Sequence, residues 1–285
     1  MRQFGYDLWR ILREQKAAMF GAIVVVIYCL TAIFGPMFVT VSNVSHPERA
    51  YEGPSWHQPL GTGPFGRGVL PELIVGTRPI MEVGVLAAVM TVAVGVAVGL
   101  STGYLGGAVD SVVMRITDVF LTVPGLPLVI VIAALIHSSS PFVLAAILSI
   151  QAWAGLARAV RSQALSLRSS SFIEAARGQA LPLRHIVGRQ LLPNVGPYVA
   201  IHFLLAVTGA IYAEVGLFLL GIAPVSGTNW GIMINIAQSQ GALYTTRSAI
   251  YLLAPMFAIV LLQVAFVLFS RALDDLFNPR TRVPA

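Results

Sequence analysis

The sequence predicts an all-α, polytopic membrane protein, and two observations support this fold class. The chain has 285 residues, of which 56% are hydrophobic and only 11% are charged, and its mean hydropathy is +0.80. Soluble domains carry about 25% charged residues. The apolar residues also gather into long runs, close to the roughly 20 residues that a helix needs to cross a bilayer. One aqueous core cannot bury that much apolar surface, so lipid must cover it.

Six apolar runs are long enough to be predicted as transmembrane helices. Only HSSSP separates the third run from the fourth, so we expect these two to form a tight helical hairpin. Pro124, Pro127 and Pro255 lie inside runs, where neighbouring groups can satisfy the backbone atoms that a proline leaves unpaired. The predicted spans are Ala17–Val39, Ile80–Gly103, Val112–Ile136, Phe142–Val160, Val195–Gly221 and Ser248–Phe269.

The basic residues predict the orientation of these spans. Six crossings place both termini on one side, and cytoplasmic termini would put fourteen of the eighteen basic residues inside. Such a bias fixes orientation in multi-pass proteins of the cell membrane. The resulting segments are a cytoplasmic amphipathic stretch (1–16) on the membrane surface, a first span (17–39), an outer loop (40–79), a core of five spans (80–271) and a cytoplasmic tail (272–285). The core includes a cytoplasmic loop at 161–193.

The stretch SFIEAARGQALPLRHIVGRQLLPN, residues 171–194, interrupts the apolar runs with a polar insert on the cytoplasmic side. Read as a helix, Ser171–Ala180 places small and apolar side chains on one face. Ser170 or Ser171 can cap its N-terminus, where the charge of Glu174 is favourable. That face comprises Phe172, Ala175, Ala176 and Gln179.

Pro182 is expected to end this first helix and to begin a second one. The second helix places Leu183 and Ile186 on one side and Arg184 on another, and it is expected to end at Leu192–Pro193, before the fifth span. Two interpretations of the insert remain open. A basic amphipathic helix can rest on lipid headgroups, whereas a shallow face of alanines grips lipid poorly and favours a groove in a partner protein.

The insert resembles the EAA loop of permease subunits of ABC importers. Glu174, Ala175 and Ala176 match its first motif, and Leu192 and Pro193 match its second at the same separation. Two positions depart from the pattern: the family's glycine falls on Ala180 and its isoleucine on Gln190.

The resemblance covers nearly the whole chain and is greatest to the second permease of dipeptide and oligopeptide importers. In the outer motif, acidic residues common in that family are replaced by Gly63 and Gly68. The matching stretches are PLGTGPFGRGVLPELIVGTR (59–78), TGYLGGAVDSVVMRITDVFLTVPGLPL (102–128), AEVGLFLLGI (213–222), NWGIMI (229–234) and LDDLFNPRTR (273–282).

This resemblance implies a type I ABC importer-like fold with six spans and a cytoplasmic coupling helix. It implies a homologous second permease, two cytoplasmic ATPases that bind ATP and Mg, and an external solute-binding protein. It also implies peptide cargo, with oligosaccharides or nickel as the alternatives in related systems. The residues it assigns to ATPase coupling are Phe172, Glu174, Ala175, Ala176, Ala180, Leu183 and Arg184.

No catalytic, cofactor or metal site is predicted in the chain, and no contact with nucleic acid is expected. GTGPFGRG (61–68) nearly matches the phosphate-binding pattern G-x-x-x-x-G-K-[ST], but Arg67 replaces the lysine and Gly68 the magnesium-binding hydroxyl. It also lies in the outer loop, so we expect its glycines to shape that loop. His46 and His57 have no cysteine or carboxylate cluster beside them to complete a metal site.

The sequence also predicts roles for a few polar residues and glycines inside the spans. Glu214 either lines the pathway or is paired within the bundle, because a charge in the bilayer needs a cavity or a partner. Asp118 is expected to pair with Arg115, three residues before it. His202 is interpreted as a bundle residue. Gly95, Gly99 and Gly103 recur every four residues and predict close helix packing, within the bundle or between two permeases.

A transporter or channel that works without ATP is the rival interpretation from another class. It predicts charge relays inside the membrane and internal inverted repeats. The sequence offers at most one or two buried acids and no obvious repeat. A purely structural membrane scaffold would leave the coupling-like insert without a role.

Overall fold

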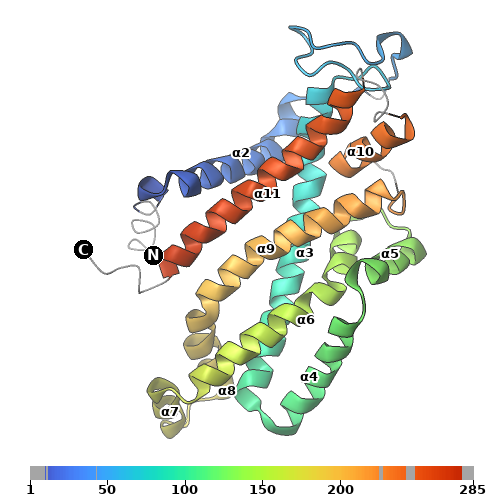
Figure 1. The fold of residues 1–285 in the computed structure, drawn as a ribbon. Helices are drawn as coiled ribbons and strands as arrows, with labels where there is room; N and C mark the ends of the chain where they lie inside the picture. The colour runs from blue at the N-terminus through green and yellow to red at the C-terminus, as the bar shows by residue number, and fades with distance from the viewer. Residues whose placement is uncertain (1–9, 11, 43, 225–226, 242–247, 278–285) are drawn as a thin grey trace.

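The fold is a bundle of long helices, seen in a computed structural model that describes residues 10, 12–42, 44–224, 227–241 and 248–277. Within these ranges the secondary structure is helical apart from one isolated bridge between Thr62 and Gly68. The elements (Figure 1) are α2 (Lys16–Phe38), the 3-10 turn η1 (Pro47–Arg49), α3 (Val69–Leu105), α4 (Gly107–Thr122), α5 (Gly125–Ile136), α6 (Pro141–Arg168), α7 (Ser171–Gly178), α8 (Leu183–His185), the π-helical segment η2 (Ile186–Leu191), α9 (Leu192–Leu219), α10 (Trp230–Ser239) and α11 (Ala249–Phe277).

The third predicted span, Val112–Ile136, is not one helix, which corrects the prediction. In the described chain, five helical segments are long and apolar enough to cross a membrane, and α4 and α5 make a sixth crossing only if counted together. These two helices meet at an angle of 85°. Val123 and Pro124 have extended backbone between them. Proline disfavours helical backbone in the residue before it and supplies no N–H, so the helix ends here.

Several helices run beyond their predicted bounds, because a helix can continue past the apolar run that crosses the bilayer. α3 begins at Val69, inside the predicted outer loop, α6 continues to Arg168, and α11 continues to Phe277. The predicted turn between the third and fourth spans is present, with His137 in left-handed backbone at the end of α5. Most of the predicted N-terminal surface segment (1–9 and 11) and the end of the predicted tail (278–285) lie outside the described residues.

The first and last spans lie side by side and bring the two ends of the described chain together (Figure 1). The Gln15 side-chain amide donates to Asp275 at 2.6 Å, and Tyr28 donates to the carbonyl of Ala258 at 2.9 Å. Both ends therefore lie on the same side of the bundle, as an even number of crossings requires.

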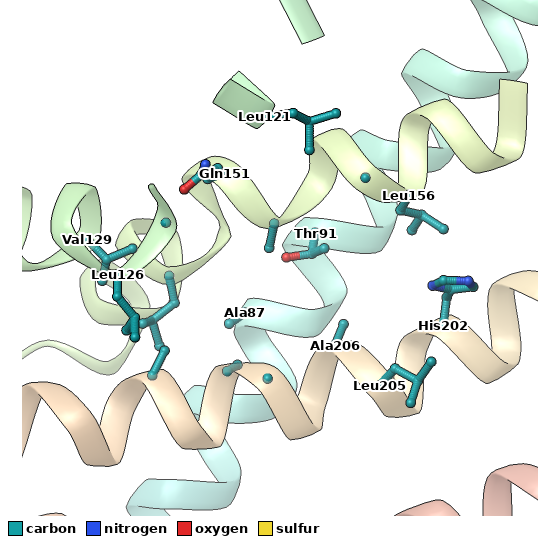
Figure 2. Close-up of a pocket in the computed structure, with 17 residues that line it drawn as sticks. Ala87, Thr91, Leu121, Leu126, Val129, Gln151, Leu156, His202, Leu205 and Ala206 are labelled. Carbon is teal, nitrogen blue, oxygen red and sulfur yellow. The ribbon is translucent and has the colours of Figure 1, made fainter. Parts of the chain in front are cut away.

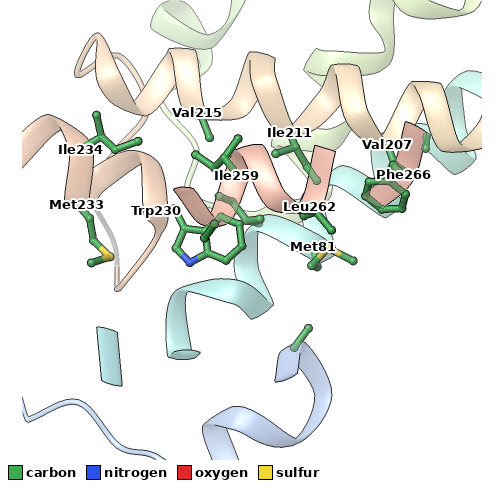
Figure 3. Close-up of a cluster of buried hydrophobic side chains, with 14 of the residues drawn as sticks. Met81, Val207, Ile211, Val215, Trp230, Met233, Ile234, Ile259, Leu262 and Phe266 are labelled. Carbon is green, nitrogen blue, oxygen red and sulfur yellow. The ribbon is translucent and has the colours of Figure 1, made fainter. Parts of the chain in front are cut away.

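The main apolar core lies among α2, α3, α9, α10 and α11 and surrounds Trp230 (Figure 3). The Trp230 indole is fully buried and donates to the carbonyl of Leu73 at 2.9 Å. Trp230 begins α10, a short helix that the span-based prediction does not contain. The Asn229 side chain accepts a hydrogen bond from the Gly231 N–H and so caps this helix.

The second span packs on α6 through its glycines, which confirms the prediction of close helix packing and places it within the bundle. A Cβ at Gly99 would lie 2.6 Å from the Ala157 carbonyl, and one at Gly103 would lie 2.6 Å from the Ala164 Cβ. Gly95 approaches Leu156 in the same way. Small residues let two backbones approach closely, which is how helices associate in lipid.

The glycine-rich outer motif forms a folded loop over the start of α3. Gly61 and Gly66 have left-handed backbone with φ of 70° and 67°. The Gly63 N–H donates to the Arg67 carbonyl at 2.7 Å, and the Thr62 hydroxyl donates to the Arg49 carbonyl at 2.5 Å. These glycines fulfil the loop-shaping role that the sequence predicts for them.

Candidate functional site

The polar insert forms α7, which lies at the end of the bundle opposite the outer loop (Figure 1). One side of α7 is held firmly by the spans, because Ile173 is 0% and Ala176 is 4% exposed. They belong to a core cluster of buried residues drawn from α3, α6, α7, η2 and α9: Leu100, Leu156, Val160, Ala164, Ile173, Ala176, Ile186, Leu191 and Val195. A displacement of α7 must therefore move these spans as well.

The other side of α7 is exposed in the described chain. Glu174, Ala175 and Gln179 are exposed, and Phe172 is 37% exposed although it is aromatic. In the following segment, Leu183 and Arg184 are exposed as well. The exposed set combines apolar side chains with charges of both signs.

Ala176 does not lie on the face that the sequence assigns to it. The predicted small-residue face groups it with Phe172, Ala175 and Gln179, but the structure turns Ala176 inward, next to Ile173. The pattern of α7 alone did not decide this, because both alanines follow the helical spacing equally well. The exposed face consequently contains Phe172, Ala175 and Gln179, and Ala176 anchors the helix.

Ala180 occupies the position at which the end of α7 needs left-handed backbone, with φ of 51°. The Ala180 N–H donates to the Arg177 carbonyl at 2.9 Å, and the Leu181 N–H donates to the Ala176 carbonyl at 3.2 Å. Leu181 also packs against the cluster that holds Ala176. This pair of hydrogen bonds and this apolar contact define a Schellman motif, in which glycine is the preferred residue. The bend of the EAA loop is thus present with alanine in place of glycine.

The N-terminus of α7 is not capped as predicted. Ser170 is the N-cap, but its hydroxyl donates to the Leu167 carbonyl at 2.6 Å and caps no N–H of α7. This bond ties the loop back to the end of α6. Arg177 adds a second tie, because its guanidinium lies 4.9 Å from the centre of the Tyr104 ring of α3 and donates to the Tyr104 hydroxyl.

The second half of the insert continues into the fifth span, which corrects the predicted end at Leu192–Pro193. α8, η2 and α9 form one helical segment over Leu183–Leu219. Pro193 falls in the first turn of α9, after a π-helical segment. The Asn194 side chain donates to the Gln190 carbonyl at 2.7 Å and satisfies an acceptor beside the proline. The loop therefore connects to α9 without a hinge at the proline.

A cavity of about 580 Å³ opens between α3, the α4–α5 break, α6 and α9 (Figure 2). Its lining is mostly apolar, with the polar side chains of Thr91, Gln151 and His202. The His202 ring packs against Tyr198 in a tilted arrangement, with ring centres 4.2 Å apart. Sequence reasoning interpreted His202 as a bundle residue, and its position at a cavity wall depends on α6, which is distant in sequence.

Glu214 lies on α9 but does not belong to the cavity lining. It is 1% exposed, and the Asn229 amide donates to one of its carboxylate oxygens at 2.9 Å. The other oxygen is buried and has no hydrogen-bond partner among the described residues. Glu214 thus pairs with a polar group of the α10 cap. Glu72, which sequence reasoning left in the outer loop, is a second buried carboxylate and accepts a hydrogen bond from Tyr251.

Asp118 pairs with Arg158 of α6 and not with Arg115, which corrects the prediction. A second ion pair joins the same two helices, since Arg161 donates to both carboxylate oxygens of Asp110 at 2.5 Å. The sequence gives no signal for either partner, because the paired residues are separated by 40 and 51 positions.

The arrangement defines a multi-helix membrane protein with a cavity between its helices and a short helix, α7, that is anchored by one side and exposed on the other. Comparison with known families agrees with this class. Residues 95–283 match the family of binding-protein-dependent transport system inner membrane components, and residues 3–54 match the N-terminal transmembrane domain of oligopeptide transport permease C. The chain therefore belongs to the family of binding-protein-dependent inner membrane permeases, the permease subunits of ABC importers.

Individual relatives resemble the chain over nearly its full length. A dipeptide transport system permease protein from Bacillus subtilis is 32% identical over 97% of this chain and 86% of the relative. An oligopeptide transport system permease protein from the same organism is 29% identical over 95% and 88%, respectively. A glutathione transport system permease protein from Escherichia coli is 31% identical over 97% and 91%.

Proposed function

We propose that this chain forms half of the translocation pathway of an importer for di- or oligopeptides. The exposed face of α7, backed by the buried Ile173 and Ala176, is the observation on which the proposal depends. Peptide cargo is supported by the names of the relatives, which include dipeptide, oligopeptide and glutathione permeases. Oligosaccharides or nickel are the cargo alternatives.

The remaining parts of the transporter come from partner proteins. Two ATPase subunits bind ATP and Mg and receive the coupling helices of this chain and of a homologous second permease. A solute-binding protein delivers cargo to the outer side. In this arrangement the protein lies in the cell membrane, and α7 and both termini face the cytoplasm. The excess of arginine on that side agrees with this orientation.

Alternating access follows from how α7 is held. ATP binding closes the ATPases and displaces the exposed face formed by Phe172, Ala175 and Gln179. The buried face transfers this displacement to α6 and α9, which line the cavity. Binding energy can shift two conformations only if contacts differ between them. The ATPases must therefore hold α7 differently in the nucleotide-bound and nucleotide-free states.

The cavity suits a ligand whose recognised groups are neutral amides. Thr91 and His202 in its lining can donate and accept hydrogen bonds, while apolar side chains surround them. A peptide backbone offers matching donors and acceptors. Uptake into vesicles of a labelled dipeptide, an oligosaccharide or Ni²⁺ distinguishes the three cargo classes, and saturable uptake of only one identifies the cargo.

Glu174→Arg tests the docking of α7. Glu174 is exposed in the first turn, so the substitution reverses a charge on the proposed contact surface without disturbing the core. We expect normal membrane insertion, loss of ATPase copurification and about tenfold less ATP-driven uptake, the change that roughly 1.4 kcal/mol produces. Asp274→Arg, a charge reversal at an exposed position of α11, is the matched control. Normal copurification and uptake by the Glu174 variant would show that this face is not the docking surface.

A further inference from the structure

Helix α4 is attached to the bundle in an unusual way. Its two buried residues, Asp110 and Thr117, are both polar. Its large apolar side chains are exposed instead, as shown by Val109, Val112, Ile116 and Val119. In a membrane such an apolar face suits lipid or another subunit. α4 is therefore attached to its own chain by polar contacts and by the edge-on contact of Phe120 with Trp153.

Those contacts all come from α6. Arg161 holds Asp110 through two hydrogen bonds of 2.5 Å, and Arg158 pairs with Asp118. The Gln151 amide donates to the carbonyl of Phe120 at 2.6 Å and to that of Val123. The three α6 residues are seven and three positions apart, which places them on one face of the helix.

Gln151 acts where α4 ends and the chain turns into α5. The last carbonyls of a helix have no partner within the helix, and Gln151 satisfies two of those near the break at Pro124. Gly125 leaves room for this amide, because a Cβ there would lie 2.9 Å from Gln151 Oε1. Gln151, Gly125 and the neighbouring Leu121 and Leu126 all line the cavity. The break and its support are thus part of the cavity wall.

We infer that α6 transmits the movement of α7 to the α4–α5 break through Arg161, Arg158 and Gln151, with Gln151 as the positioning residue that holds the break at the cavity. α6 leads into α7 through two residues, Ser169 and Ser170, and the polar contacts lie along its length toward the break. The inference rests on the proposed function, because α7 must be moved by an ATPase. The inference adds that α4 and α5 together, here called the α4–α5 arm, are the part of the cavity wall that opens and closes.

Gln151→Leu in the reconstituted complex tests this role, since leucine fills much of the same space but has no N–H to donate. We expect assembly and basal ATP hydrolysis to persist while substrate moved per ATP hydrolysed falls about tenfold, because two carbonyls near the break lose their donor. Gln163→Leu makes the same change elsewhere on α6 and should leave this ratio unchanged.

Distances measured between spin labels show which helix fails to move in the Gln151→Leu variant. In a Cys29→Ala background, one pair of labels joins Leu135 of α5 to Met37 of α2, and a second joins Ser169, beside α7, to Ala17. We expect both distances to change on trapping with ATP and vanadate in the otherwise native chain. In Gln151→Leu, the Ser169 distance should still change and the Leu135 distance should not.

Each other result overturns a different statement. The inference is wrong if the Leu135 distance changes as much in Gln151→Leu as in the native chain. It is also wrong if, in the native chain, the Ser169 distance changes and the Leu135 distance does not. In both cases the proposed function stands. If nucleotide moves neither label in the native chain, the proposed function fails and the inference falls with it. An unchanged ratio of substrate to ATP in Gln151→Leu also contradicts the positioning role.

Discussion

Helices α3 and α4 pack against the same helix, α6, by opposite means. α3 approaches it through Gly95, Gly99 and Gly103, with backbone and small side chains in direct contact. α4 is joined to it by two ion pairs, by the Gln151 amide and by the edge-on contact of Phe120 with Trp153. Close apolar contact over a long helix resists separation everywhere along its length, whereas a few polar contacts act only at separate points.

This difference separates a fixed part of the molecule from a part that can change its position. The α3–α6 contact lies within the bundle and continues to the cluster that holds α7. The α4–α5 arm, broken by 85° and largely exposed, has few buried residues of its own. Regions with few buried apolar contacts open at low free-energy cost. An importer that works by alternating access needs both kinds of region.

Gly99→Ala should give the largest loss of stability. The new Cβ would lie 2.6 Å from the Ala157 carbonyl, so α3 and α6 must separate. We expect unfolding in detergent to show a loss of about 3 kcal/mol. Gly216→Ala on α9 is the control, because a Cβ there meets no atom within 4 Å. Equal stability of the two variants would mean that α3 and α6 do not need glycine at position 99 to pack closely.

Arg161→Leu should have the next largest effect. It leaves the Asp110 carboxylate, which is 8% exposed, without the guanidinium that pairs with it. We expect a loss of about 2 kcal/mol in the same unfolding measurement. Adding Asp110→Asn should recover at least part of this loss, since the unpaired charge is removed. A double variant less stable than Arg161→Leu would contradict this explanation.

Ala180→Gly extends the comparison to the loop at the end of α6. Alanine pays a conformational cost in left-handed backbone that glycine does not, so the variant should stabilise α7 by about 1 kcal/mol. Slower hydrogen exchange of the α7 amides would report this gain. Ala175→Gly, in right-handed helix, should speed the same exchange. Changes of the same sign in both variants would argue against strain at Ala180.

Asp118→Asn should have the smallest effect. The side chains of Asp118 and Arg158 are each more than half exposed, at 57% and 54%. Exposed ion pairs contribute about 0.5 kcal/mol. A double-mutant cycle with Arg158→Gln measures the coupling energy. A coupling energy as large as that of Asp110 with Arg161 would show that the two ion pairs stabilise α4 equally. We expect a smaller value, because Asp118 and Arg158 are the more exposed pair.

Among the candidate site residues, the sequence located helix α7 but not its orientation. Glu174 and the alanines after it identified the insert, because a polar helix between two apolar runs is a local pattern. Ala175 and Ala176 are neighbours with the same side chain, and only packing against the buried cluster of α3, α6, η2 and α9 decides that Ala176 is the buried one. Likewise, the proline at position 124 was visible, but its consequence, a break of 85°, depended on Gln151 to satisfy the exposed carbonyls.

By itself the sequence determined the membrane class, the approximate place of five of the six predicted spans and the position of the insert between the fourth and fifth spans. These features follow from the composition of continuous stretches, whose transfer into lipid depends on neighbouring residues alone. Tertiary structure alone decided that Asp118 pairs with Arg158, that Glu214 pairs with Asn229 and that the cavity lies at the α4–α5 break. Each of these depends on which helix faces are brought together by packing, and a one-dimensional pattern does not specify that.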